Sequence, residues 1–173
     1  MGKTGTFSHL SSTNGDALDG LATGSKGYLW AAGVQGDHKL RVSVFDGKSF
    51  GEFSRKGFCR DIRGLFPKSA NLAILVSADG IMKIGRNGIK QVDLRKTPLW
   101  TTPNNDPDGP RPAVWLYSCA QTQNRAIFLI GHTKKLVRWA DAKFSTIAEG
   151  HFSSLVAGAA GDQHPLAVRE DPV

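Results

Sequence analysis

Residues 72–94 read LAILVSADGIMKIGRNGIKQVDL, the clearest local pattern in the chain. An apolar run and two alternating runs are separated by Asp79–Gly80 and Asn87–Gly88. Asp-Gly and Asn-Gly are strong signals for a two-residue hairpin turn, because these residues reach positive φ at little cost. The stretch therefore predicts a three-strand antiparallel meander.

The same layout recurs on both sides of this stretch. Residues 28–53 and 126–147 again read as strand, turn, strand, turn and strand. A further strand-like segment precedes each of the three units, at residues 18–23, 61–66 and 115–120. Each unit therefore has the strands of a four-stranded antiparallel sheet.

The spacing of the units indicates how they assemble. Measured from Trp30 to Leu75 and on to Phe128, the period is 45 and then 53 residues. Propeller blades repeat at roughly 40–50 residues, and each blade needs neighbours to cover its apolar faces. The excess in the second interval lies in one insertion at residues 97–114.

We predict an all-β, β-propeller-like array of four-stranded antiparallel blades within a single domain, residues 1–173. The expected boundaries of the three full blades are 18–53, 60–94 and 114–148, and a fourth blade is shared between the termini, from 152–170 plus 4–10. If the termini do not pair, the chain is an open arc with exposed strand edges, which a second copy or a host complex would cover. A β-sandwich is the alternative fold, since short strands with regular turns suit it too.

Two segments resemble the generic blade repeat of regulatory and sensor-type β-propellers. They are Leu29–Gly33 with Val44–Phe50, and Leu136–Asp141 with Phe144. The resemblance covers nearly the whole chain and implies the propeller fold. The chain has no Trp-Asp dipeptide, kelch double glycine or Asp-box, so the resemblance names no subfamily.

The composition agrees with a folded β protein. A chain of 173 residues with 40% hydrophobic residues is large enough to bury a continuous core, and 20 glycines and eight prolines suit a protein with many tight turns. No apolar run reaches the roughly 18 residues that a membrane span needs, and the N-terminus lacks the apolar stretch of a secretory signal. We therefore expect no membrane span, and a cytoplasmic location by default.

The insertion contains the most distinctive candidate contact residues. Loops of this length are uncommon in compact domains and are often functional, and Trp and Arg are enriched at interface hot spots. Trp100 and Arg111 are therefore candidate partner-binding residues, with a solvated connector between blades as the alternative. The acidic run at 104–109 begins like a calcium loop, but Trp115 stands where that loop needs Glu.

Basic residues gather near the connections between the expected blades. The net charge is +7 with a pI of about 9.7, which favours acidic partners. The chain has no interleaving of aromatic and basic residues of the kind that reads RNA, so no motif supports nucleic acid. If these connections share one rim, the partner-binding candidates there are Arg55, Lys56, Arg60, Arg63, Arg95 and Lys96. The alternative is ordinary solubilising charge.

No pattern in the sequence points to a cofactor, a metal or a catalytic motif. Cys59 and Cys119 lack zinc-type spacing and are expected to be buried thiols. The histidines are scattered, although His38 and His132 occupy equivalent turns of the first and third units. We therefore expect no cofactor and no metal.

The predicted function is a non-enzymatic protein-interaction or scaffolding module that uses its blade loops and a basic rim. A protein partner or a larger assembly is expected, with a homo-oligomer as one form. One alternative is a carbohydrate-binding, lectin-like propeller, whose aromatic side chains would stack on sugars. The other is an enzyme with its site in the central channel, for which convergence of Asp19, Asp61 and His151 would be the sign.

Overall fold

The computed structural model describes residues 19–23, 28–34, 38–45, 50–54, 59–85, 87–102, 105–106, 109–110, 113–156 and 166–169. These residues form strands and turns, and contain no helix. In particular, no helix within them is long and apolar enough to cross a membrane.

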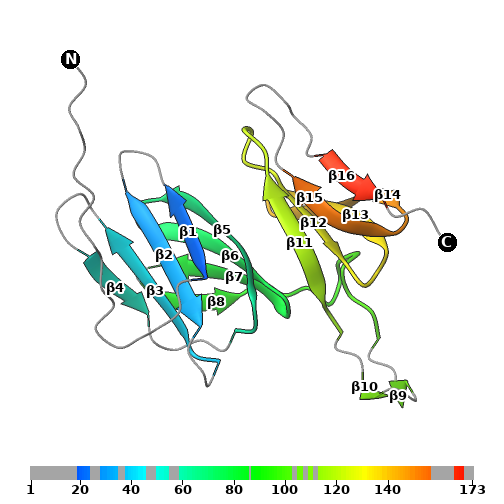
Figure 1. The fold of residues 1–173 in the computed structure, drawn as a ribbon, viewed down its shortest axis with the longest axis horizontal. Helices are drawn as coiled ribbons and strands as arrows, with labels where there is room; N and C mark the ends of the chain where they lie inside the picture. Colours follow the sequence, from blue (N-terminus) through cyan, green and yellow to red (C-terminus); the bar gives the residue numbers. More distant parts are fainter. Residues whose placement is uncertain are drawn as a thin grey trace.

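Three four-stranded antiparallel sheets make up most of the molecule (Figure 1). Their strands follow one another in chain order. The first sheet is β1 (Gly20–Thr23), β2 (Leu29–Val34), β3 (Leu40–Phe45) and β4 (Phe50–Ser54); the second is β5 (Ile62–Ser69), β6 (Leu72–Ser77), β7 (Gly80–Gly85) and β8 (Gly88–Gln91); the third is β11 (Leu116–Gln121), β12 (Ile127–Gly131), β13 (Lys135–Ala140) and β14 (Lys143–Glu149).

Two smaller pieces complete the described structure. β15 (Phe152–Val156) pairs with β16 (Leu166–Arg169) beside the third sheet, as the start of a fourth unit. β9 (Asn105–Asp106) and β10 (Gly109–Pro110) form a short hairpin that projects from the insertion, which the sequence predicted to have no secondary structure (Figure 1). The predicted strand at residues 4–10 lies outside the described residues, so the closure of the fourth blade stays a prediction.

The turns of the second sheet lie one residue earlier than the sequence predicts. Ser77 pairs with Gly80, so the turn consists of Ala78 and Asp79. The Ser77 hydroxyl explains the shift, because it donates a hydrogen bond to Asp79 Oδ1 at 2.7 Å and lies 3.1 Å from the Gly80 carbonyl. Gly85 likewise pairs with Gly88, which shifts the next turn by one residue.

The core lies between successive sheets, as in a propeller. Along β6, Ala73 and Leu75 pack against the first sheet, whereas Ile74 and Val76 pack against the third. Sheets that are buried on both faces need near-continuous apolar strands, which β6 and β12 supply. A β-sandwich buries one face of each sheet, so the sandwich alternative is wrong and the propeller-like array is confirmed.

The first strands of the units lie side by side and surround a common axis. β5 contacts both β1 and β11, and β11 contacts β15. The starts of β5 and β11 both meet the β6–β7 turn: Ala78 N donates to Asp61 O at 3.0 Å, and Leu116 N donates to Ala78 O at 2.7 Å. We call the end of the molecule where β1, β5, β11 and β15 begin the strand-start face, and the opposite end the strand-end face.

Candidate functional site

A hollow of about 440 Å³ opens on the strand-start face between the second and third sheets. It joins the β6–β7 turn to the segment that follows β8 and to the residues before β11. Its charged lining residues are Asp79, Asp93 and Arg95, and its largest apolar wall is Trp100. The remaining lining residues are Gln91, Val92, Leu94, Ala113 and Val114.

Asp79 is held in place by the fold of its own turn. The buried Ser77 hydroxyl donates to Asp79 Oδ1 at 2.7 Å, and the backbone N–H of Arg60 donates to the same oxygen at 3.4 Å. Both bonds end on one carboxylate oxygen. The carboxylate is therefore oriented while it lines a solvent-accessible hollow.

Arg95 and Asp93 form a two-pronged ion pair on the exposed side of the hollow. Arg95 Nε lies 2.9 Å from Asp93 Oδ1, and Arg95 Nη2 lies 2.7 Å from Oδ2. The hydrogen bonds from the Arg95 side chain and backbone lower the pKa of Asp93 to about 2, with a smaller contribution from the Lys96 charge. The pair fixes the guanidinium at the mouth of the hollow.

Trp100 packs against the core of the second and third sheets, where it contacts the cluster containing Leu94, Leu99 and Val114. A turn aims it there, because Trp100 N donates to Thr97 O at 3.1 Å and Thr97 N donates to Leu94 O at 3.0 Å. The side chain is half-buried, so it forms a wall of the hollow and does not project as a free anchor.

Acidic groups also gather at the start of the channel, around Cys59. Burial, and to a smaller extent the charges of Asp79, Asp19 and Asp61, raise the pKa of the Cys59 thiol to about 11, against a hydrogen bond with Ser77 that lowers it. The three carboxylates therefore lie near one buried thiol. Of the three groups that the sequence named as the sign of an enzyme, Asp19 and Asp61 come together, and His151 stands at the start of β15 on the same face.

Arg63 on β5 pairs with Asp61, the residue just before β5, with Nη2 and Oδ2 3.4 Å apart. Burial raises the pKa of Cys119 to about 12, and the Arg63 charge partly opposes that rise, so Arg63 also lies near the third sheet. Both cysteines are free; Cys59 is buried, as predicted, whereas Cys119 is only partly buried.

His132 has a structural role. Its Nδ1 accepts a hydrogen bond from Trp115 N at 3.0 Å, and its Nε2 lies 2.8 Å from Thr101 Oγ1. With Nδ1 as acceptor, Nε2 carries the proton and donates to the threonine. Both ring nitrogens are occupied in joining the insertion to the β12–β13 turn. The described part of the chain contains no group of three residues suited to a metal ion.

The structure brings part of the predicted contact set together. Arg95 and Trp100 line the same hollow, and the Arg60 backbone holds Asp79 there. Lys96 is exposed next to Arg95, and Arg63 lies in the channel. Arg55, Lys56 and Arg111 lie outside the described residues.

The sequence analysis missed Asp79 and Asp93 as site residues. Asp79 was interpreted only as a turn residue, and the signal that could have found it was the Ser77-x-Asp79 spacing that lets a buried hydroxyl hold the carboxylate. Trp30 of the first unit and Trp139 of the third lie in the core, with 0% and 8% exposure, so neither is placed to stack on a sugar.

Neither family models nor curated proteins match this chain. Among solved structures, a catalytically inactive H270A virginiamycin B lyase from Staphylococcus aureus, determined with quinupristin, aligns with a TM-score of 0.55 at 18% identity over 85% of this chain. A streptogramin B lyase aligns with a TM-score of 0.52 at 13% identity over 93% of this chain. The fold is thus of the propeller type. The chain spans about half of these structures, 48% and 57% of their lengths.

These comparisons contradict the prediction of a non-enzymatic scaffold and the prediction that the chain is not an enzyme. Both solved structures are lyases, so they favour the alternative of an enzyme that works at the channel. At such low identity they show the fold alone. The residues of this chain must therefore supply the argument for any activity.

Proposed function

We propose that this chain is an enzyme, or the part of one, that performs acid–base chemistry on a small molecule in the strand-start hollow. The observation that carries the proposal is Asp79: an oriented carboxylate in a 440 Å³ hollow that also contains a guanidinium and an indole wall.

Asp79 is the general base. Ser77 and the Arg60 N–H bind one of its oxygens, which leaves the other oxygen to receive a proton. A positioned base of this kind contributes roughly 10²–10⁴-fold to a rate. Because both donors, Ser77 beside the turn and the Arg60 N–H before β5, are part of the fold, the carboxylate needs no rearrangement when a substrate arrives.

Arg95 is the group that stabilises developing negative charge. Its Nε and Nη2 are engaged by Asp93, and its Nη1 is left to meet a substrate oxygen. The Arg95 side chain is exposed in the free protein, and a substrate seated against the apolar wall of Trp100, Leu94 and Val114 would displace water from it, which strengthens such a donor. The two charged groups and the wall together suit removal of a proton next to a carbonyl group.

The reaction class that this arrangement supports is a lyase-type elimination. Asp79 takes a proton from the carbon next to a carbonyl, the electron pair forms a carbon–carbon double bond, and the bond to a leaving oxygen breaks. The leaving oxygen takes a proton from water, and Asp79 returns its own proton to solvent. Both similar structures are named lyases, so a streptogramin B compound is the first substrate to test.

The test is the loss of quinupristin, followed by liquid chromatography. The wild-type chain should consume the compound, and Asp79→Asn should slow the loss by about 100-fold or more, because the amide cannot accept the proton. Asp141→Asn, an exposed carboxylate on the opposite face, is the matched control and should leave the rate unchanged. Equal rates for wild type and Asp79→Asn, or no loss with either, would contradict the proposal.

A further inference from the structure

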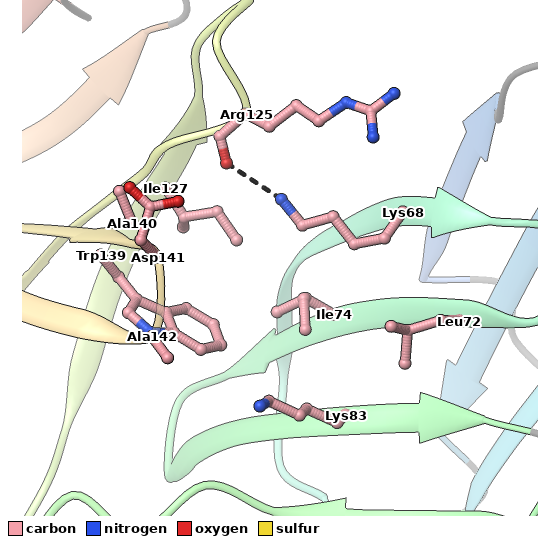
Figure 2. Close-up of a pocket in the computed structure, with 10 residues that line it drawn as sticks. All are labelled: Lys68, Leu72, Ile74, Lys83, Arg125, Ile127, Trp139, Ala140, Asp141 and Ala142. Carbon is pink, nitrogen blue, oxygen red and sulfur yellow. Dashed lines mark hydrogen bonds between the residues drawn. The ribbon is translucent and has the colours of Figure 1, made fainter.

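A second hollow lies between the same two sheets on the strand-end face, with a volume of about 210 Å³. Figure 2 shows it bounded by the second sheet on one side and by the β13–β14 turn of the third sheet on the other. Its floor is apolar and is formed by Ile74, Ile127 and Trp139. No step of the proposed enzyme reaction uses it.

The charges of this hollow are mostly positive. Lys68 and Lys83 project from the second sheet toward the turn (Figure 2), and Arg125 adds a third cation beside one acidic residue, Asp141. Neither lysine pairs with a carboxylate within the described residues. Lys68 Nζ donates instead to the carbonyl oxygen of Arg125 at 2.9 Å. The hollow therefore contains two ammonium groups that are not paired with any described carboxylate, next to apolar walls.

A β-bulge in β5 presents Lys68 to the hollow. Pro67 pairs with Ala73 and Ser69 pairs with Leu72, so Lys68 has no partner across the ladder. Bulges of this type redirect a side chain and occur frequently next to functional sites. Burial, together with the nearby Arg125 charge, lowers the pKa of Lys68, which means that an entering anion would relieve an unfavourable positive environment.

The backbone around the hollow includes residues in the left-handed conformation. Five non-glycine residues in the described part of the chain have positive φ, and three of them line this hollow: Arg125, Asp141 and Ala142, at 64°, 50° and 61°. Asp141 and Ala142 are the two central residues of the β13–β14 hairpin turn, in which positive φ is the ordinary conformation. Arg125 lies in the β11–β12 connection, where a left-handed non-glycine residue costs free energy. Hydrogen bonds preserve the Arg125 conformation, because Arg125 N donates to Thr122 O at 2.9 Å and Ala126 N donates to Asn124 Oδ1 at 3.2 Å.

We propose that the strand-end hollow is a binding site for a small aromatic carboxylate. The ring lies on the apolar floor of Ile74, Ile127 and Trp139, and the carboxylate accepts hydrogen bonds from the ammonium groups of Lys68 and Lys83. The volume is below the roughly 300–1,000 Å³ of sites for drug-sized ligands, so the ligand has about one ring. An uncharged molecule of the same shape lacks the attraction to the lysines.

Benzoate is the probe, and two-dimensional amide NMR on the full chain measures the binding. We expect a dissociation constant on the order of 1 mM, given the few atoms of the ligand. The shifts should concentrate at Ala142, Lys83 and the Trp139 indole N–H. Benzamide, of matching shape and no charge, should bind at least about tenfold more weakly.

Lys83→Gln should weaken benzoate about tenfold, because a charge-assisted hydrogen bond is lost from an exposed residue that does not support the fold. Lys68→Gln should weaken it to a similar degree, with the amide spectrum reporting that the protein is folded. Lys96→Gln, an exposed lysine on the other face, is the matched control and should bind benzoate like the wild type. No saturable binding in the millimolar range, equal binding of benzamide, or indifference to both lysine substitutions would overturn the proposal.

Discussion

The two hollows lie between the same pair of sheets and differ in how their charges are compensated. On the strand-start face, Arg95 pairs with Asp93, and Arg63 pairs with Asp61 in the channel beside it. On the strand-end face, Lys68 and Lys83 face apolar walls, and no carboxylate among the described residues pairs with either. A site for chemistry needs groups that are fixed by their neighbours, whereas a site for an anion needs cations that are still available. The difference suggests that one sheet interface serves two purposes.

The largest expected effect separates the two hollows by function. Asp79→Asn should reduce quinupristin turnover by about 100-fold or more and leave benzoate binding unchanged, since Asp79 and Lys83 lie at opposite ends of the sheets. Lys83→Gln should weaken benzoate binding and leave quinupristin turnover unchanged. Chromatography and amide NMR on the same two variants measure both effects. If either variant alters both readouts while it is folded, the hollows are not independent.

The next effect compares how much Trp139 and Trp100, one in the lining of each hollow, contribute to stability. Trp139 is 8% exposed and stacks on Phe144 with ring centroids 5.2 Å apart, so Trp139→Ala should lower the free energy of unfolding by about 3–5 kcal/mol. Trp100 is only half-buried, so Trp100→Ala should lower it by about 1–2 kcal/mol. Urea unfolding followed by circular dichroism gives both values. Equal losses would mean that Trp100 belongs to the core as fully as Trp139 does.

The smallest effect concerns the Asp93–Arg95 pair. The pKa of the Asp93 carboxyl is about 2 in the folded protein, below the ordinary value of about 3.9. The ion pair therefore stabilises the folded state above about pH 4, and this contribution is lost as the pH falls toward 2. Carbon-detected NMR should show the Asp93 carboxyl titrating near pH 2 in the wild type. In Arg95→Gln its midpoint should move up toward the ordinary value. A midpoint that is the same in both proteins would remove the pair from the account.

Local signals in the sequence predict much of the fold. Asp-Gly, Asn-Gly and the apolar run of β6 locate a meander correctly, because turn preference and alternation depend on adjacent residues. The one-residue shift at the β6–β7 turn was not predicted, since it depends on where the Ser77 side chain donates. The same limit explains why Asp79 was missed: Arg60, which helps to hold it, is 19 residues away.

The site could be predicted only in part. Arg95 and Trp100 were both predicted as contact residues, and they line the same hollow. Arg95 lies at the mouth of the hollow, and Trp100 forms part of its wall. The strand-end hollow gave no signal, because Lys68, Lys83 and Trp139 come together only when the second and third sheets stack. The preference for acidic partners inferred from the net charge stays a prediction.

A crystal structure of the Asp79→Asn protein with quinupristin examines the assignment of the strand-start hollow at the level of atoms. We expect the compound to lie against Trp100, with an oxygen beside the Arg95 guanidinium and a carbon–hydrogen bond directed at the side chain of position 79. The assignment would be contradicted if quinupristin occupied the Lys68–Lys83 hollow. It would also be contradicted if the protein bound quinupristin and the strand-start hollow did not contain it.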